Sequence, residues 1–288
     1  IGLFDLTFTV TITNDFVTVA PSNVLFSFLN ISGCIKVRVL NLFLIIRRLA
    51  IMLVKENLEK YFKSFLSLPW TEDSIPGNIV EEIIALTYEA KVINTYDYVD
   101  VIDQSNLQRG WQVKSTKETT PVTWKRAKIP NKVTLIENSQ GSAEGIQVLG
   151  DTIISFCNDH AEESCKLYNL DEIYYSRCIL FKDRSVKYFE RKLATSDDPR
   201  IFIPEDFYWK WSSPKNIIKK EQLSALHGFR KLDGKKMWAW HGHGENQLHF
   251  SGESEWWNDG KNSLELTFTP TSRMSYDQFF KIISSEII

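Results

Sequence analysis

Four side chains between residues 97 and 114 have the types and the spacing that metal-assisted hydrolysis requires. Two are carboxylates, one is an amide and one is an amine: Asp97, Asp100, Gln112 and Lys114. A carboxylate can hold a divalent cation, while a neighbouring ammonium group can orient an attacking water and offset the charge of a phosphate. If the chain folds so that these groups converge, their chemistry suits the hydrolysis of a phosphodiester bond.

A β-hairpin would bring these residues together. Tyr96–Ile102 is aromatic and β-branched, Gly110–Ser115 alternates apolar and polar residues, and residues typical of a turn lie between them. In a strand, Gln112 and Lys114 share one face and Val113 takes the other, so aspartates of the first strand can lie beside the amide and the amine. The alternative is an edge hairpin whose charged groups lie in solvent.

An aspartate, a short interval and then Gln112-Val113-Lys114 resembles the signature of the PD-(D/E)XK nuclease superfamily, in its Gln-x-Lys variant. Upstream, Gly77–Ile84 is similar to the helix that often carries a further active-site glutamate in this family, here Glu81. The resemblance covers about residues 75 to 130. It implies an α/β, restriction-endonuclease-like fold with a central mixed β-sheet flanked by helices.

The resemblance also implies a catalytic set and a metal-binding set that overlap. The catalytic residues are Glu81, Asp100, Gln112 and Lys114; the metal ligands are Asp100, Gln112 and Asp97, with Mg²⁺ as the cofactor. We favour Asp100 over Asp97 as the main acid because Asp-Val-Ile-Asp leads directly into the turn, but the register of the hairpin decides between them. A glutamine amide can bind a hard cation without contributing charge, so this site should hold its metal more weakly than one with two carboxylates there.

Residues after the second predicted strand carry hydroxyl groups and positive charge. Those expected to contact the DNA backbone are Ser115, Thr116, Lys117, Lys125, Arg126 and Lys128. The formal net charge of the 288 residues is −2, which gives no overall attraction to nucleic acid. A nuclease of this composition needs a local basic cleft. The alternative is that the basic cluster is an ordinary solvated face.

The chain is expected to have three regions. Residues 1–51 are loosely patterned and threonine-rich, and we expect them to be a non-native or poorly packed extension, with native translation beginning at Met52 and a helix over Leu53–Leu68. The alternative is an N-terminal strand region packed on the core. Residues 52–194 are expected to form the nuclease core.

Residues 195–288 are rich in aromatic and basic residues. Their six tryptophans (Trp209, Trp211, Trp238, Trp240, Trp256 and Trp257) suit either DNA target recognition or an ordinary aromatic core. His241-Gly-His243, with His249 nearby, resembles a metal-binding pattern, although a glycine-rich hairpin with exposed histidines explains it as well.

The most specific function that these patterns support is a magnesium-dependent type II restriction endonuclease that hydrolyses double-stranded DNA at a short sequence. We expect a cytoplasmic homodimer with no membrane partner and with a cognate DNA methyltransferase encoded nearby. Four cysteines without a Cys-x-x-Cys pair agree with reduced thiols. The alternatives are another PD-(D/E)XK nuclease (repair, modification-dependent or mobile-element) and a non-catalytic DNA-binding protein.

Overall fold

The structure, a computed structural model, describes residues 9–13, 16–20, 33–71, 74–93, 95–103, 107–217, 220–256 and 259–286. The chain divides into two compact units, Ile1–Glu56 and Asn57–Ile288. Each unit is described by itself. Among the described residues, no helix combines the length and the apolar character needed to cross a lipid bilayer.

The first unit contains a β-hairpin and the first part of a long helix. β1 (Thr9–Thr13) pairs antiparallel with β2 (Phe16–Ala20), and α1 (Gly33–Leu66) begins in this unit. The sequence predicts a helix that starts at Leu53, and this start is wrong. No proline or glycine interrupts the chain between Gly33 and Leu53, so nothing in the sequence stops the helix from starting earlier. That residues 1–51 are a non-native extension stays a prediction.

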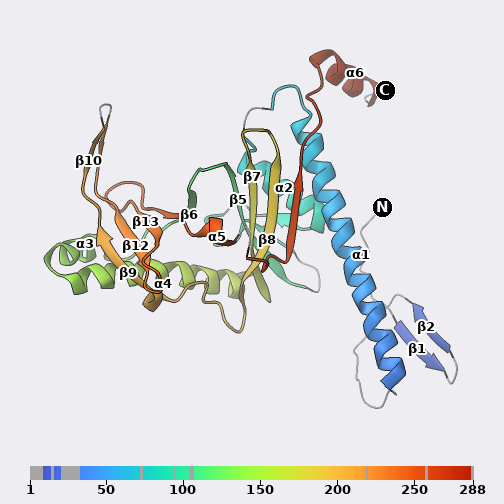
Figure 1. The fold of residues 1–288 in the computed structure, drawn as a ribbon, viewed down its shortest axis with the longest axis horizontal. Helices are drawn as coiled ribbons and strands as arrows, with labels where there is room; N and C mark the ends of the chain where they lie inside the picture. The colour runs from blue at the N-terminus through green and yellow to red at the C-terminus, as the bar shows by residue number, and fades with distance from the viewer. Residues whose placement is uncertain are drawn as a thin grey trace. The chain divides into compact units, whose positions relative to one another are not determined.

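A six-stranded sheet is the centre of the second unit (Figure 1), with the strand order β15-β8-β7-β5-β4-β3. The strands are β3 (Lys91–Val92), β4 (Val101–Ile102), β5 (Arg109–Lys117), β7 (Glu172–Leu180), β8 (Val186–Thr195) and β15 (Leu264–Phe268). β5 and β7 are parallel, and the other neighbouring pairs are antiparallel. The predicted α/β class with a central mixed sheet and flanking helices is therefore confirmed.

Helices flank this sheet and connect its parallel strands. α2 (Gly77–Tyr88) precedes the sheet, and α3 (Lys132–Gly141) and α4 (Ala143–Tyr168) lie in the long crossover that a parallel pair requires between β5 and β7. The end of α1 buries Leu58, Phe62 and Leu66 along one stripe. The Phe62 ring lies 5.6 Å from the ring of Tyr188 on β8, so this part of α1 packs on the sheet.

A second, antiparallel sheet has the strand order β6-β14-β13-β12-β9. Its strands are β6 (Val122–Arg126), β9 (Phe207–Trp211), β12 (Leu226–Arg230), β13 (Lys236–Trp240) and β14 (Gln247–Phe250). The two sheets exchange strands along the sequence, since β6 joins this sheet and β15 returns to the first. The predicted division at residues 194 and 195 stays a prediction.

The remaining elements are short. They are the 3₁₀ turn η1 (Pro204–Asp206), the strand pair β10 (Lys215–Ile217) and β11 (Lys220–Gln222), α5 (Glu253–Trp256) and α6 (Tyr276–Glu286). In Figure 1, α4 extends beneath both the β9–β12–β13 strands and the β5–β7–β8 strands of the second unit.

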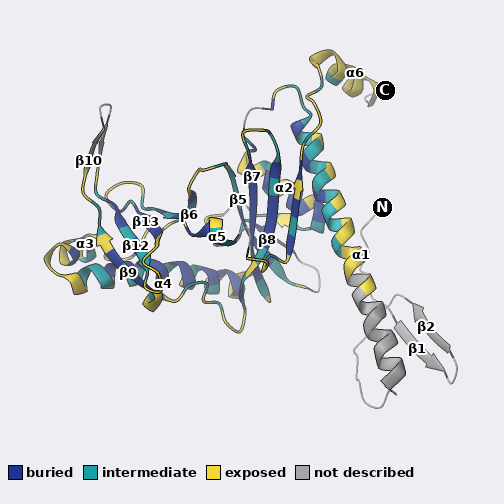
Figure 2. Ribbon diagram, viewed as in Figure 1, coloured by how far each residue is buried: buried dark blue, intermediate teal, exposed yellow. Residues whose placement is uncertain are grey.

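Most of the C-terminal tryptophans belong to the core between α4 and the second sheet. Trp209, Trp238 and Trp240 are buried, Trp211 and Trp256 are half-buried, and Trp257 lies outside the described residues. Trp238 contacts Trp124 of β6 edge-on at 5.9 Å and Phe250 of β14 at 4.5 Å. In Figure 2, dark blue marks the buried residues of α4 and of the strands of the second sheet. These rings stabilise the fold, and a role of this region in target recognition stays a proposal.

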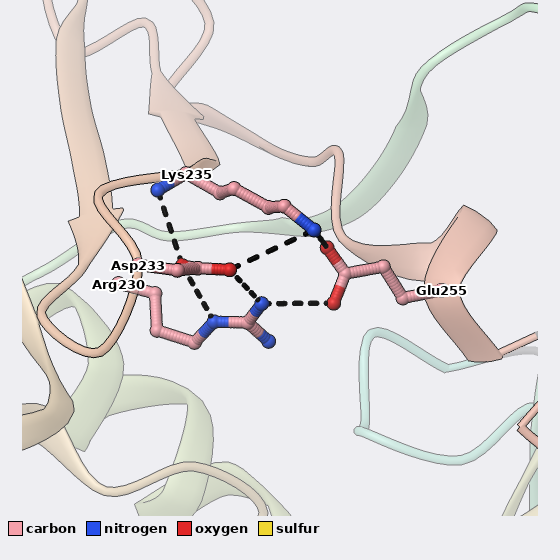
Figure 3. A network of polar contacts seen from close by, with 4 residues as sticks. All are labelled: Arg230, Asp233, Lys235 and Glu255. Atoms are coloured by element: carbon pink, nitrogen blue, oxygen red, sulfur yellow. Dashed lines mark hydrogen bonds and ion pairs between the residues drawn. The ribbon is translucent and has the colours of Figure 1, made fainter.

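Ionic contacts on two sides fix α5. At its exposed side, Arg230 donates to Asp233 and to Glu255 (2.5 and 2.9 Å), and Lys235 donates to Glu255 at 3.0 Å (Figure 3). The Arg230 guanidinium holds the pKa of Asp233 well below its usual range. At its buried side, Glu253 forms an ion pair with Arg177 of β7 at 3.1 Å. α5 therefore connects the β12–β13 turn to the six-stranded sheet.

Gly150→Ala should destabilise the protein because α4 approaches β9 closely at this residue. A Cβ atom at position 150 would lie 2.2 Å from the Trp209 ring, and overpacking of this kind costs about 1–3 kcal/mol of unfolding free energy. Gly141→Ala is the control: its Cβ would meet nothing within 4 Å, so stability should stay equal or rise by up to ~1 kcal/mol. Urea denaturation measures both, and equal stability of the two variants would contradict the packing of α4 on β9.

Candidate functional site

Asp100 lies directly before β4, and two hydrogen bonds attach it to the central strand β5. Its backbone N–H donates to the carbonyl of Trp111, and its Oδ2 accepts from the backbone N–H of Val113, both at 2.7 Å. The hairpin register places Val101 opposite Trp111, which leaves Asp100 beside the next residues of β5. The carboxylate therefore has a fixed place next to Gln112 and Lys114.

The predicted hairpin forms, but its first strand is shorter than expected, since β4 covers only Val101–Ile102 instead of beginning at Tyr96. β5 is a central strand between β4 and β7, so the alternative of an edge hairpin is wrong. Lys125 explains the short first strand. Its Nζ donates to the carbonyls of Tyr96 and Asp97, both at 2.7 Å, so these two carbonyls are already satisfied without strand pairing.

Lys114 lies beside Asp100. Its Nζ is 3.9 Å from Asp100 Oδ2, and the two side chains are 22% and 27% exposed. At this distance the charges attract each other without a direct hydrogen bond. Strand alternation places Gln112 on the same face as Lys114, and both side chains line one pocket. The structure thus brings an acid, an amide and an amine together.

Gln112 is the most deeply buried of these side chains, with 1% of its surface exposed. Its Nε2 donates to the carbonyl of Trp124 at 3.2 Å, which fixes the orientation of the amide. Its Oε1 is buried and has no hydrogen-bond partner among the described residues. An unpaired buried acceptor costs free energy, and an amide oxygen is a ligand type that hard cations accept. A cation at this place would satisfy Oε1.

Glu81 on α2 belongs to the same electrostatic cluster. Burial raises the pKa of Glu81, the Asp100 carboxylate raises it further, and the Lys114 ammonium lowers it. Asp100 and Lys114 therefore each lie close enough to act on the charge of Glu81. Glu81 is not among the described residues that line the pocket, and its place in the catalytic set stays a prediction.

Asp97 lines the same pocket, and its carboxylate is hydrogen-bonded to other residues of the fold. The hydroxyl of Tyr168 on α4 donates to its Oδ2 at 2.6 Å, and hydrogen bonds from Thr95 and Tyr168 lower the pKa of Asp97. Of the two candidate aspartates, Asp100 is the one that the structure places beside Lys114. Asp97 lies on the part of the wall nearest α4.

The six residues expected to contact DNA fall into two groups. Lys125, Arg126 and Lys128 line the pocket. Burial, and next the charge of Lys114, lowers the pKa of Lys125, while Arg126 forms an exposed ion pair with Glu245 at 3.4 Å. These three residues give the pocket a cationic wall.

The other three expected DNA contacts lie away from the pocket lining. Ser115 Oγ donates to the carbonyl of Ile75 at 2.5 Å, the hydroxyl of Thr116 accepts from Arg177, and Lys117 is exposed at the end of β5. The hydroxyl groups of Ser115 and Thr116 are therefore engaged within the fold. Of these three residues, Lys117 is exposed, whereas Ser115 and Thr116 are half-buried.

The pocket has a volume of about 400 Å³, and α4 supplies a wall that the sequence analysis does not assign to the site. Phe156 and His160 lie one turn apart on α4, and their rings are 4.3 Å apart. Burial, and next the charge of Lys125, lowers the pKa of His160, which favours the neutral imidazole. The spacing of Phe156 and His160 in the sequence indicates that they share one face of a helix. Nothing in the neighbouring sequence indicates that this face lines the pocket.

Asp100, Glu81 and Gln112 offer oxygen atoms, the donor type that a hard divalent cation prefers. Within the described part of the chain, no three His, Cys, Asp or Glu side chains gather to hold a metal ion. The proposed set has two such side chains, Asp100 and Glu81, and needs the amide of Gln112 as the third donor. An all-oxygen set suits Mg²⁺, and the Oε1 of Gln112, which has no partner within the described ranges, favours it.

Comparison with known proteins gives no relative. No family model matches the chain, and neither a curated protein nor a solved structure matches it.

Glu81→Gln should raise the free energy of unfolding at neutral pH. Because the folded state raises the pKa of Glu81, ionising this residue costs stability as the pH rises through that pKa, and glutamine avoids the cost. The gain should be present above the raised pKa and vanish below pH 4.5, the ordinary value. Urea denaturation across this range measures it. Glu137→Gln, at an exposed position on α3, is the control, and a gain of equal size and pH dependence there would contradict the cluster.

Proposed function

We propose that the chain is a magnesium-dependent deoxyribonuclease of the PD-(D/E)XK type, most specifically a type II restriction endonuclease with a restriction-endonuclease-like fold. One observation carries the proposal: Asp100 is fixed 3.9 Å from Lys114, next to a buried Gln112 Oε1 that has no partner among the described residues. A helix glutamate, Glu81, acts on the same charges. The order Glu, Asp, Gln-x-Lys along the chain supports the proposal.

In the proposed mechanism, each residue has a separate task. Asp100 and Gln112 would hold the cation, with Glu81 as a further donor. When bound, Mg²⁺ supplies the charge that polarises the phosphate and makes a bound water more acidic. Lys114 orients the attacking water for in-line displacement at phosphorus and offsets the negative charge that develops there.

The basic wall of the pocket would bind the DNA backbone. Lys125, Arg126 and Lys128 line the pocket, and their positive charges suit contacts with phosphates near the bond that is cut. A palindromic target would favour a homodimer, because two-fold DNA matches a two-fold protein. A cytoplasmic location and a methyltransferase encoded nearby complete the proposal for a restriction enzyme.

Lys114→Ala should slow Mg²⁺-dependent cleavage of phage DNA by at least ~100-fold, because it removes the group that positions water and balances charge. Lys166→Ala is the control, since Lys166 lies 73% exposed on α4 and pairs with Glu162. Gel electrophoresis of timed digests measures both rates.

The pattern of products separates the alternatives. Discrete bands support a restriction enzyme, and a smear or structure-selective nicking supports another nuclease of the superfamily. Cleavage by Lys114→Ala at the wild-type rate would contradict the mechanism. DNA binding without metal-dependent cleavage by the wild-type protein would support the non-catalytic alternative.

A further inference from the structure

A second pocket lies on the outer face of the antiparallel sheet, and neither the predicted site nor the proposed mechanism uses it. Its volume is about 260 Å³, and the polar residues Ser212, His227, Lys236, His241, His249 and Ser251 contribute to its lining. This volume is below the range of about 300–1,000 Å³ that is usual for sites enclosing a whole small molecule. We call this second pocket the histidine pocket. Its volume suits one group of a larger ligand.

The register of four strands builds this pocket. His227 of β12 lies opposite Ala239 of β13, Ala239 lies opposite His249 of β14, and His249 lies opposite Thr123 of β6. Residues that oppose each other across neighbouring strands share a face of the sheet. The small side chain of Ala239 thus separates two imidazoles and leaves the hollow between them.

His241 completes the cluster from the end of β13. The pattern His241-Gly-His243 does not lie on a strand, because β13 ends at Trp240. The His241 ring lies 5.1 Å from that of His249, whereas His243 is exposed and contacts Trp211. The spacing of the pair in the sequence therefore does not place the two rings in one site.

The chemistry of the lining matches a phosphate group. Among the described residues that form the pocket, none is Asp or Glu, while three are histidines, one is a lysine and three are serines. Imidazole N–H, ammonium and hydroxyl groups can all donate to phosphate oxygens, which only accept. Burial lowers the pKa of His241, as does Lys236 to a smaller degree, and burial with the charge of His241 lowers the pKa of His249. A bound anion would oppose these shifts.

Thr123 connects the histidine pocket to the candidate site. Its side chain lines the pocket that holds Asp100 and Lys114, and its Oγ1 lies 3.5 Å from His249 Nδ1. A ligand with phosphates at successive positions could occupy both pockets by crossing β6. A nucleic-acid strand has this property, since it carries a phosphate at every residue.

We propose that the histidine pocket binds a backbone phosphate of the same nucleic-acid strand whose scissile phosphate occupies the pocket of Asp100 and Lys114. This inference rests on the proposed function for its choice of ligand. Phosphate contacts of this kind position a duplex without reading its bases. The outer face of the second sheet, rather than its buried tryptophans, then guides the DNA toward the candidate site.

The test is the affinity of the full-length protein for a short fluorescein-labelled DNA duplex of mixed sequence, measured by fluorescence anisotropy in EDTA so that no cleavage occurs. The double variant His241→Gln/His249→Gln should bind about tenfold more weakly, the loss expected for one charge-assisted hydrogen bond. Lys236→Gln, at an exposed position at the start of β13, should weaken binding in the same direction and reduce the salt dependence by about one phosphate.

The pH dependence gives a second readout. Wild-type affinity should rise as the pH falls from about 7.5 to 5.5, because a phosphate favours the protonated imidazoles, and the double variant should lose most of this rise. The groups that face the two rings are His227 from β12, Lys236 from β13 and Thr123 from β6. The matched control is His243→Gln, which should keep both the affinity and the pH dependence.

Two outcomes would overturn the inference: wild-type affinity in the double variant, or an equal loss in His243→Gln. If the first is accompanied by Zn²⁺ stabilisation that the double variant loses, the histidines form a metal site instead. Failure of the proposed function is distinguishable, because it appears as unaltered cleavage by Lys114→Ala and leaves the anisotropy result intact. Circular dichroism checks that the double variant folds. If it does not fold, the DNA affinity of Lys236→Gln tests the inference, and wild-type affinity in Lys236→Gln would overturn it.

Discussion

The hydrogen bond from the backbone N–H of Val113 to the Asp100 carboxylate is the contact on which the candidate site depends. It connects a residue outside regular strand pairing to the central strand of a mixed sheet, at 2.7 Å. A second hydrogen bond, from the Asp100 N–H to the Trp111 carbonyl, fixes the position of Asp100 along β5. Because Gln112 and Lys114 belong to that strand, their positions relative to the acid follow from backbone geometry.

The rest of the fold keeps β5 central and closes the pocket around it. The parallel partner β7 requires a long crossover, and α4 within that crossover brings Phe156 and His160 to the pocket wall and Tyr168 to the carboxylate of Asp97. β6 belongs to the second sheet, yet its Trp124 carbonyl orients the Gln112 amide. The oxygen of that amide is buried without a hydrogen-bond partner among the residues that the structure describes, which costs free energy in a purely structural role.

Sequence reasoning found the features of the site that depend on local pattern. Strand alternation predicts that Gln112 and Lys114 share a face, and the helical pattern after Pro76 predicts the element that carries Glu81. Both are properties of a short segment. The choice between Asp97 and Asp100 is different, because it depends on the register and on contacts from Lys125 and Tyr168, which are distant in sequence.

The features that sequence reasoning missed are non-local. Nothing in Val122–Arg126 shows that β6 pairs with β14, more than a hundred residues later, and nothing in Leu264–Phe268 shows that β15 returns to β8. The tryptophans suited a core and a binding face equally, because composition does not distinguish the two sides of a strand. Only the sheet register shows that Trp238 and Trp240 are buried while Ala239 faces the histidines.

Divalent-cation binding tests the central claim most directly, because it addresses the site without requiring the correct DNA sequence. Electron paramagnetic resonance of Mn²⁺ titrated into the protein measures the free ion. We predict that Asp100→Asn weakens Mn²⁺ binding by at least ~10-fold through loss of the anionic ligand, whereas Lys114→Ala binds the ion at least as tightly as the wild type. Equal Mn²⁺ affinity in the wild-type protein and Asp100→Asn would contradict the account.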